Sequence, residues 1–253
     1  MTGRPALESV RAVVFDTDGV LLDSASLHAA AWKAAFDGCL EARASEQPPF
    51  DADVEYRRLV DGKARFDGAR AFLEARGLAL PAGCAGDPPG CGSVWAVAAR
   101  KEQVFTRLLR SRPVPPFPDV VPALHGLRGD GIRCAAVSAS RHAGDLLDAA
   151  GIGDLFDAEV DGREAARLRL PGKPDPALFL EAASRLRTPP GDTAVVEDAL
   201  AGVEAGRRGA FGAVVGVDRA ADPRRASALA AGGADLVLRE LTALLTHLSG
   251  APT

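Results

Sequence analysis

Six acidic or hydroxyl side chains follow three short apolar segments of the chain. They are Asp16, Asp18, Ser138, Ser140, Glu197 and Asp198. The apolar segments that precede them, at residues 11–15, 133–137 and 194–196, are typical of buried strands. In an open parallel sheet, ligands bind beyond the carboxyl ends of the strands. We therefore expect these side chains to gather at one edge of a sheet.

The acids in this group predict a metal site. Carboxylates that converge on one point repel one another and raise each other's pKa values unless a cation neutralises them. Oxygen ligands without His or Cys favour a hard cation, and Mg²⁺ suits a phosphate site because it keeps waters and bridges phosphate oxygens. The predicted ligands are an oxygen of Asp16, the backbone carbonyl of Asp18 and the carboxylate of Asp198. Glu197 is predicted to be a further ligand or to lie just outside the ligands.

Asp16 and Asp18 are spaced as a nucleophile and an acid/base that leave the same turn. Asp16 is predicted to attack phosphorus in line and to form an aspartyl phosphate. Asp18 is predicted to protonate the leaving oxygen and then to deprotonate the incoming nucleophile. Gly19 permits the tight turn that would bring backbone N–H groups to the phosphate. Hydrolysis of a phosphate monoester would require the site to lower the barrier by about 20 kcal/mol.

A phosphate site also needs positive charge and hydrogen-bond donors. Lys173, in PGKP, is the candidate cation, because only four of the 30 basic residues are lysine and a lysine supplies a compact point charge. Ser138 is predicted to donate to phosphate oxygens, together with backbone N–H groups of Ala139 and Ser140 at the start of the following helix. Metal, lysine and covalent catalysis together are a plausible source of the barrier lowering.

Each of these residues also has a purely structural interpretation. The DTDG segment is compatible with a solvated turn after a strand. Glu197-Asp198 is compatible with a helix N-cap whose acid complements the helix dipole. Lys173 is compatible with an ordinary surface charge, and Ser138 with a small residue chosen for packing. The convergence of all the motifs at one sheet edge favours the catalytic interpretation.

The elements that would position these residues predict an α/β protein. From about residue 124 onward, short apolar strands alternate with helical segments, which is typical of parallel βαβ units in a doubly wound, Rossmann-like sheet. Residues 25–110 have helical patterns and poor strand signals, so they predict an inserted α-helical cap domain. Residues 1–24 and 111–253 would then form the core domain. The predicted strands lie at 11–15, 133–137, 156–160, 194–196, 213–217 and 235–238, and the predicted helices at 25–36, 66–76, 94–109, 143–150, 176–186, 199–208 and 240–248.

The composition narrows the classes of function. Hydrophobic residues make up 47% and charged residues 25% of the 253 residues, the balance of a soluble globular protein. The net charge is −4 and the basic residues are spread along the chain, so no nucleic-acid partner is expected. No apolar run approaches the length of a membrane span, and Met1–Ser9 lacks the apolar core of a signal peptide. We expect no membrane partner and a cytoplasmic location.

The four cysteines do not form a metal-binding pattern. Cys39, Cys84, Cys91 and Cys134 include no CxxC pair, and no histidine lies near two of them in the sequence. A disulfide between Cys84 and Cys91 is geometrically conceivable across CAGDPPGC. Because no export signal is present, free thiols in a reducing compartment are the favoured interpretation.

The chemical motifs together resemble a known superfamily. FDTDGVLLDS, the serine after the second predicted strand, GKPDP and VEDALAG resemble, in that order, the four signature motifs of the haloacid-dehalogenase-like phosphotransferases. The resemblance extends over essentially the whole chain, and the helical insert resembles the helical C1 cap of that superfamily. It implies an enzyme that transfers phosphoryl groups through an aspartyl phosphate. Asp18 favours phosphoryl transfer, because the dehalogenase branch lacks that second acid.

Within that superfamily the cap resembles that of the β-phosphoglucomutases. The segment DGVLLDSASLHAAAWKAAF, with His28 and Trp32, resembles the start of their cap, and DGKAR resembles a cap loop whose arginine holds the second phosphate of the substrate. The resemblance implies that Arg65 and Lys101 bind the distal phosphate and the sugar, and that His28 and Trp32 contact the substrate. Trp32, Phe36 and Phe72 are also predicted to be core residues. Solvated helix charges are the alternative for both residues, and a surface or hinge histidine is the alternative for His28.

Two residues depart from the mutase pattern, and three functions remain in competition. His142 replaces an asparagine, in a chain that contains none, and Ala199 replaces a hydroxyl residue; both departures bear on sugar specificity. A β-phosphoglucomutase-like mutase acting on a small-molecule sugar phosphate is the leading hypothesis. A phosphatase acting on a sugar phosphate or similar metabolite is the alternative, and a catalytically silent binding protein is the third. A monomer or weak homodimer is expected.

Overall fold

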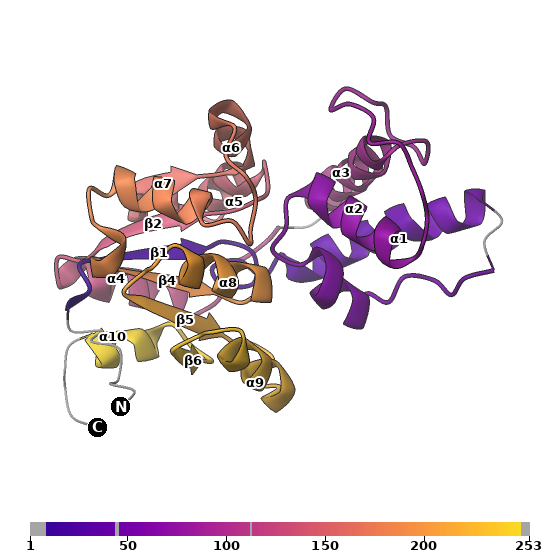
Figure 1. The fold of residues 1–253 in the computed structure, drawn as a ribbon. Coiled ribbons are helices and arrows are strands. Elements are labelled where there is room, and N and C mark those ends of the chain that lie inside the picture. Colours follow the sequence, from indigo (N-terminus) through magenta and orange to yellow (C-terminus); the bar gives the residue numbers. More distant parts are fainter. Residues whose placement is uncertain (1–8, 44–45, 112, 249–253) are drawn as a thin grey trace. The chain divides into compact units, whose positions relative to one another are not determined.

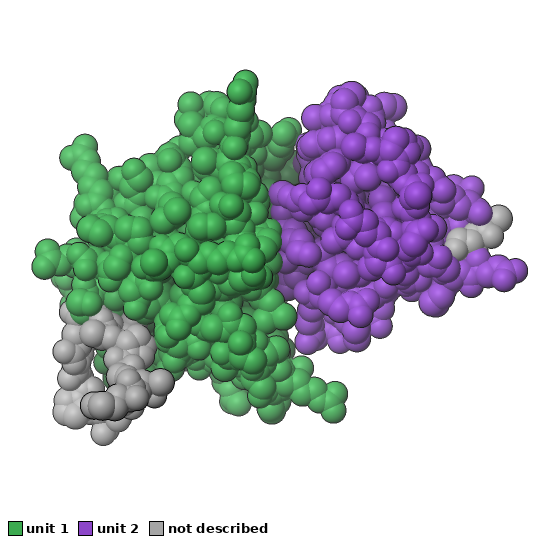
Figure 2. Space-filling model, in the orientation of Figure 1, with its two compact units in different colours: residues 1–23, 115–253 green, residues 24–114 purple. Residues whose placement is uncertain are grey.

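The computed structural model describes residues 9–43, 46–111 and 113–248. It divides the chain into two compact units, one of residues 1–23 and 115–253 and the other of residues 24–114 (Figure 2). The sequence places the corresponding boundaries at 24/25 and 110/111. The segment that bears on a signal peptide, Met1–Ser9, lies outside the described residues except for its last position. None of the helices in the described ranges is long and apolar enough to cross a membrane.

The first unit contains a parallel sheet of six strands in the order β3-β2-β1-β4-β5-β6 (Figure 1). Its central strands are buried on both faces, since Val14 and Phe15 point to opposite faces and are both 0% exposed. This burial explains why the strands are continuous apolar runs. The predicted α/β class and Rossmann-like sheet are confirmed. The strands are β1 Ala12–Asp16, β2 Arg133–Val137, β3 Ala158–Val160, β4 Thr193–Glu197, β5 Ala213–Val217 and β6 Leu236–Leu238.

The strand order places a topological switch point between β1 and β4. From β1 the chain progresses outward to β2 and β3, and it then returns to pair β4 with the other side of β1. In doubly wound sheets a crevice opens at such a point, outside the carboxyl ends of the strands. The residues that end β1 and β4 are Asp16 and Glu197. The topology alone therefore brings the two main acidic motifs to the same crevice.

Helices connect the strands of this unit. Helix α7 packs on β1, β2 and β3, and α8 packs on β4 and β5, while α9 packs on β5 and β6. The sequence did not predict α4, α6 or α9, although Asp222 accepts from the N–H of Arg224 and Pro223 occupies the first turn, a recognisable N-cap signal for α9. The helices are α4 Val120–Gly129, α5 Ala143–Ala149, α6 Gly162–Leu168, α7 Ala177–Arg185, α8 Leu200–Arg208, α9 Pro223–Ala231 and α10 Thr242–Leu248.

The second unit is helical and has its own core. It contains α1 Ala25–Ala42, α2 Arg65–Ala75 and α3 Val94–Ser111, with a π-helical turn at Tyr56–Val60. Phe36 stacks on Phe72 with ring centroids 3.8 Å apart, and Trp32 stacks on Phe36 at 4.8 Å. All three rings are buried, as the sequence predicted for core residues. The predicted contact of Trp32 with substrate remains a prediction.

A disulfide joins Cys39 to Cys91 within the helical unit, with their Cα atoms 5.3 Å apart. Both the favoured prediction of free thiols at these positions and the conceivable pair of Cys84 and Cys91 are wrong. Cys39 lies on α1 and Cys91 just before α3, and these two helices pack against each other, so the fold brings together cysteines that are 52 residues apart. Cys84, which is exposed, and Cys134, which is buried, are free.

Candidate active site

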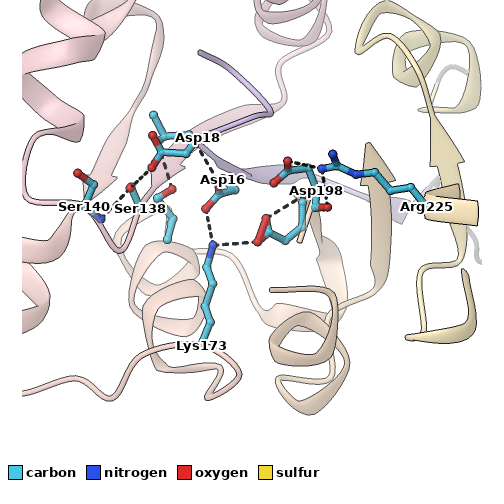
Figure 3. Close-up of polar contacts among 10 residues, drawn as sticks. Asp16, Asp18, Ser138, Ser140, Lys173, Asp198 and Arg225 are labelled. Atoms are coloured by element: carbon cyan, nitrogen blue, oxygen red, sulfur yellow. Dashed lines mark hydrogen bonds and ion pairs between the residues drawn. The ribbon is translucent and has the colours of Figure 1, made fainter. Parts of the chain in front are cut away.

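The Asp16 carboxylate is held on both of its oxygens at the carboxyl end of β1. The backbone N–H of Asp18 donates to Asp16 Oδ2 at 2.9 Å, and the ammonium group of Lys173 contacts Asp16 Oδ1 (Figure 3). Asp16 is 5% exposed. A carboxylate fixed in this way loses little rotational freedom when it attacks, which is the arrangement required of an oriented nucleophile. The solvated-turn interpretation does not fit this burial.

Lys173 reaches the acids from the loop between α6 and α7. Its Nζ atom donates to Glu197 Oε1 at 3.2 Å as well as to Asp16, and it lies 4.7 Å from the ring centroid of Phe179. The side chain is fully buried. A buried ammonium requires paired anions, and here it has two. Lys173 is therefore not an ordinary surface charge.

Burial and charge shift the pKa values of this ion pair upward. Burial is the largest influence on Asp16 and, with Asp18 and Asp198, it raises the pKa of Asp16 to about 7 although Lys173 opposes the rise. Burial would lower the pKa of Lys173, but the Asp16 and Glu197 carboxylates outweigh it and raise that pKa above its ordinary value. Lys173 therefore stays charged across the physiological pH range.

Ser138 orients Asp18. Its hydroxyl donates to Asp18 Oδ2 at 2.9 Å and accepts from the backbone N–H of Ser140, also at 2.9 Å (Figure 3). The single hydroxyl proton of Ser138 is thus directed at the acid/base candidate, whereas the sequence predicted a donor to phosphate. Register explains the contact, because Asp16 pairs with Val137 in the neighbouring strands and the residues that follow each strand come side by side.

The rest of the loop after β2 is closed by local contacts. The backbone N–H of His142 donates to Ser140 Oγ at 3.3 Å, and His142 occupies the N-cap position of α5. A Cβ atom on Gly162 would lie 2.6 Å from the carbonyl oxygen of Ala139, so this loop packs tightly on the start of α6. The backbone N–H of Ser140 already donates to the Ser138 hydroxyl. The structure therefore does not support the prediction that this N–H donates to phosphate. Ala139, between the two serines, is half-buried.

Gly19 makes the turn after the acids, but it does not supply a donor. Its φ of +81° lies in the region that favours glycine, and its N–H donates to the carbonyl of Leu22 at 2.9 Å. A Cβ atom at this position would lie 2.2 Å from Asp198 Oδ2. The prediction that Gly19 permits a tight turn is confirmed. Its own N–H is not the predicted phosphate donor.

Three carboxylates gather where a cation could be held. One oxygen from each of Asp16, Glu197 and Asp198 lies within 4.8 Å of the others, and all three residues are buried. Burial is the main cause that raises the pKa values of Glu197 and Asp198, and it is reinforced by neighbouring acids. Oxygen donors that are short of positive charge fit a hard divalent cation.

Glu197 has protein donors on both of its oxygens. Oε1 accepts from Lys173, and Oε2 accepts from the backbone N–H of Asp198 at 3.1 Å. A Cβ atom on Gly202 would lie 1.9 Å from Glu197 Oε1, so the glycine of VEDALAG makes room for this carboxylate. These contacts favour the alternative in which Glu197 lies just outside the ligands and holds Lys173.

Arg225 is a site residue that the sequence did not predict. It lies on α9 and pairs with Asp198, its Nη2 atom 2.5 Å from Asp198 Oδ2 (Figure 3). Position 225 lies 27 residues after Asp198 in a segment with no chemical motif. The DP pair at 222–223 could have predicted the helix, but not the face on which Arg225 lies.

Two of the candidate substrate residues of the helical unit, Lys101 and His28, contact each other. Lys101 is 5% exposed, and its Nζ atom lies 3.0 Å from His28 Nδ1 and 4.2 Å from the ring centroid of Phe105. Arg65 pairs with Glu102 at 3.2 Å. The solvated-charge interpretation is therefore wrong for Lys101. The predicted binding roles of Arg65, Lys101 and His28 stay predictions.

Comparisons with known proteins identify the family of the chain. Residues 10–209 match the family described as haloacid dehalogenase-like hydrolase. The chain is 40% identical over 242 residues to a β-phosphoglucomutase of Mycobacterium bovis, covering 94% of this chain and 92% of that protein. It is 30% identical over 208 residues to a fructose-1-phosphate phosphatase of Escherichia coli, covering 82% of this chain and 96% of that protein.

A solved structure has the same fold. The crystal structure of a β-phosphoglucomutase from Clostridium difficile superposes with a TM-score of 0.71 at 23% sequence identity, covering 93% of each chain. At this identity the likeness concerns the fold, including a core sheet and a helical insert. The motif order and the sequence matches carry the chemical argument.

Proposed function

The chain belongs to the haloacid dehalogenase-like hydrolase family and is an enzyme of the phosphoryl-transfer type, and from this premise we propose that it is a Mg²⁺-dependent mutase that converts β-glucose 1-phosphate to glucose 6-phosphate. The geometry that supports phosphoryl transfer is the buried Asp16 carboxylate held between Lys173 and the Asp18 backbone. The choice of a mutase is supported by 40% identity to a β-phosphoglucomutase over 94% of the chain.

In the first half-reaction Asp16 accepts the phosphoryl group. One Asp16 oxygen forms a bond to phosphorus while the bond from phosphorus to the leaving oxygen breaks. Asp18, whose carboxyl group is aligned by Ser138, gives its proton to that leaving oxygen. Lys173 stays beside Asp16 and balances negative charge at the acceptor.

In the second half-reaction Asp18 works in the opposite direction. It accepts the proton of a sugar hydroxyl as the hydroxyl oxygen attacks phosphorus, and the bond between phosphorus and Asp16 breaks. The carboxylate of Asp16 is thereby regenerated, and Asp18 is protonated again for the next cycle. A phosphatase would use water in place of the sugar hydroxyl, with the same residues.

An oxygen of Asp16, the backbone carbonyl of Asp18 and the carboxylate of Asp198 would hold Mg²⁺. When bound, the cation neutralises charge on the acids and on the transferring phosphoryl group. Glu197 fixes Lys173 beside these ligands through its contact at 3.2 Å. We further expect a monomer or weak homodimer and a cytoplasmic location.

Phosphorus NMR tests the choice of reaction. β-Glucose 1-phosphate is incubated with the enzyme, Mg²⁺ and a trace of the corresponding bisphosphate. We expect the resonance of glucose 6-phosphate to grow as that of the substrate falls. Inorganic phosphate with no glucose 6-phosphate would reject the mutase and support the second candidate. That candidate is a sugar-phosphate phosphatase, which the 30% identity to a fructose-1-phosphate phosphatase favours.

Substitution of Arg65 separates the two activities. A mutase must hold the second phosphate of its bisphosphate intermediate, and Arg65 on α2 is the proposed donor. We expect Arg65→Ala to lower mutase kcat/KM by at least about 150-fold, since charge-assisted hydrogen bonds contribute roughly 1.5–3 kcal/mol each and two can form to one phosphate. Hydrolysis of a small aryl phosphate should change by less than about threefold.

Arg70→Ala is the matched control for Arg65→Ala. Arg70 lies on the same helix, is 52% exposed and pairs with Asp67 at 3.0 Å, so its removal changes the same charge away from the proposed site. We expect the mutase and aryl phosphatase activities of Arg70→Ala to match those of the unsubstituted enzyme. Equal losses of mutase and aryl phosphatase activity in Arg65→Ala would mean that Arg65 is structural.

The stabilisation given by Mg²⁺ should increase with pH. Without a cation, Asp16 keeps its proton up to about pH 7 in the folded protein, because its pKa is raised to about 7, whereas the unfolded chain loses it near pH 4. The folded state therefore binds more protons between these values, so its stability falls as pH rises. A cation that binds the ionised acids offsets this loss, and its affinity rises over the same pH range.

Thermal unfolding with and without Mg²⁺ measures this effect. At a cation concentration of 100 Kd the expected stabilisation is about 2.7 kcal/mol at pH 8, and it should be markedly smaller at pH 5. K⁺ at equal ionic strength controls for salt. The same rise in Tm at both pH values would show that the three acids do not bind the cation.

A further inference from the structure

Arg225 contacts the Asp198 carboxylate from outside the acidic cluster. Its Nη2 atom donates to the backbone oxygen of Asp198 at 3.0 Å and to Asp198 Oδ2 at 2.5 Å (Figure 3). The arginine side chain is 20% exposed, whereas that of Asp198 is 6% exposed. One nitrogen therefore joins the main chain and the side chain of the same residue, and it does so from a helix that follows the neighbouring strand β5.

Gly19 approaches the same carboxylate oxygen from another direction. A Cβ atom at position 19 would lie 2.2 Å from Asp198 Oδ2 but 3.3 Å from Asp198 Oδ1. Oδ2 is thus packed against the turn that follows Asp18 and is also bonded to Arg225. These two contacts restrict rotation of the carboxylate. The hydrogen bond to the backbone oxygen of Asp198 holds Arg225 in place relative to the sheet, because Asp198 directly follows β4.

We propose that Arg225 is a positioning residue that fixes the Asp198 carboxylate in the orientation in which it accepts the divalent cation, and that it thereby sets the affinity of the site for that cation. The proposal rests on the Mg²⁺ site of the proposed function. Carboxylates that bind metals are themselves held by hydrogen bonds from outside the ligands, and loss of such a partner lowers metal affinity 10–100-fold.

The positive charge of Arg225 by itself would lower the affinity of the site for the cation, opposite to the effect of its positioning role. A guanidinium near the site repels a divalent cation, so a purely electrostatic role predicts tighter cation binding when Arg225 is removed. The guanidinium is partly exposed, and solvent and salt screen its charge. Its hydrogen bond to the buried carboxylate of Asp198 is shielded from water, where such bonds are stronger. We therefore expect the loss of orientation to outweigh the relief of repulsion.

Arg224 offers a matched control on the same helix. It is exposed, and its backbone N–H donates to Asp222 Oδ1 at 2.9 Å as part of the helix cap. Arg224→Ala removes the same charge from the adjacent position and leaves the contact between Arg225 and Asp198 in place. Arg225→Lys is a complementary variant, because it keeps the positive charge and loses the fork of the guanidinium.

The test is calorimetric titration of Mg²⁺ into each full-length protein after removal of cations with a chelator. We expect Kd for Mg²⁺ to rise about tenfold in Arg225→Ala and to stay unchanged in Arg224→Ala. Arg225→Lys should also bind Mg²⁺ more weakly than the unsubstituted protein. Lysine keeps the positive charge that repels the cation, but it no longer fixes the orientation of the Asp198 carboxylate. Circular dichroism in chelator establishes that each variant is folded.

Two results would overturn the inference. One is Mg²⁺ binding by Arg225→Ala that equals or exceeds that of the unsubstituted protein, and the other is an equal loss in Arg224→Ala. If Arg225→Ala does not fold, Arg225→Lys decides, and unchanged binding in that variant rejects the positioning role. Failure of the unsubstituted protein to bind Mg²⁺ would instead reject the proposed metal site itself, which distinguishes the two failures.

Discussion

Asp16→Asn is expected to lower turnover by a factor on the order of 10⁴ or more, the scale on which removal of a covalent nucleophile acts in other enzymes. The amide nitrogen and oxygen of asparagine have almost the shape of the carboxylate but cannot form the aspartyl phosphate. Asp16 is 5% exposed and is bonded to Lys173 and to the backbone N–H of Asp18, so no neighbouring carboxylate of the site replaces it without moving.

The measurement is kcat for both β-glucose 1-phosphate and a small aryl phosphate. Both reactions should fail together, because the phosphoryl acceptor is common to them. Asp130→Asn makes the same chemical change at an exposed position after α4 and should leave both rates unchanged. If Asp16→Asn retained the turnover of the unsubstituted enzyme, covalent catalysis at Asp16 would have to be abandoned.

Lys173→Met is expected to have the largest effect on stability. The substitution keeps a long apolar side chain against Phe179 but leaves the carboxylates of Asp16 and Glu197 buried without their shared cation. Breaking a buried ion pair by removing one partner costs about 3–5 kcal/mol in the free energy of unfolding. Turnover should also be lost, because Lys173 is proposed to balance charge at the phosphoryl acceptor.

Urea denaturation without Mg²⁺ measures the loss of stability in Lys173→Met. The loss should be smaller at pH 5 than at pH 8, because the raised pKa values of Asp16 and Glu197 allow both groups to be protonated at low pH. Lys33→Met is the control. Lys33 is 44% exposed, pairs with Asp37 at 2.8 Å and donates to the carbonyl oxygen of Phe50 at 2.9 Å, so its substitution should cost about 1–2 kcal/mol, less than that of Lys173. Equal losses in the two variants would contradict the buried ion pair.

The sequence was sufficient to predict the sheet and the acids at its edge. Buried parallel strands are continuous apolar runs, and such runs are visible in a single sequence. β2 was predicted at its observed bounds, and Asp16 and Glu197 were predicted to follow directly after the strands that they end in the structure, β1 and β4. Because parallel strands have a common direction, the ends of neighbouring strands meet at one edge, and local sequence carries that information.

Short surface helices were harder to predict than strands. Helix α6 is only seven residues long, and none of its residues is buried. Helix α9 has a single buried residue, Leu229. A helix that buries so little has a weak apolar periodicity, so its pattern does not stand out from that of a loop. For that reason the sequence did not predict that Arg225 lies on a helix beside the site.

By itself, the sequence determined which chemical groups the protein possesses and that the fold would collect them: Asp16, Asp18, Lys173 and the paired acids Glu197-Asp198 all lie beside strands or in recognisable motifs. Only the tertiary structure decided which of these side chains contact one another. Ser138 bonds Asp18 across 120 residues, Arg225 bonds Asp198, and Cys39 pairs with Cys91. Such contacts depend on the direction in which a side chain leaves its element and on the packing of elements distant in sequence. Local propensity and spacing carry no record of either.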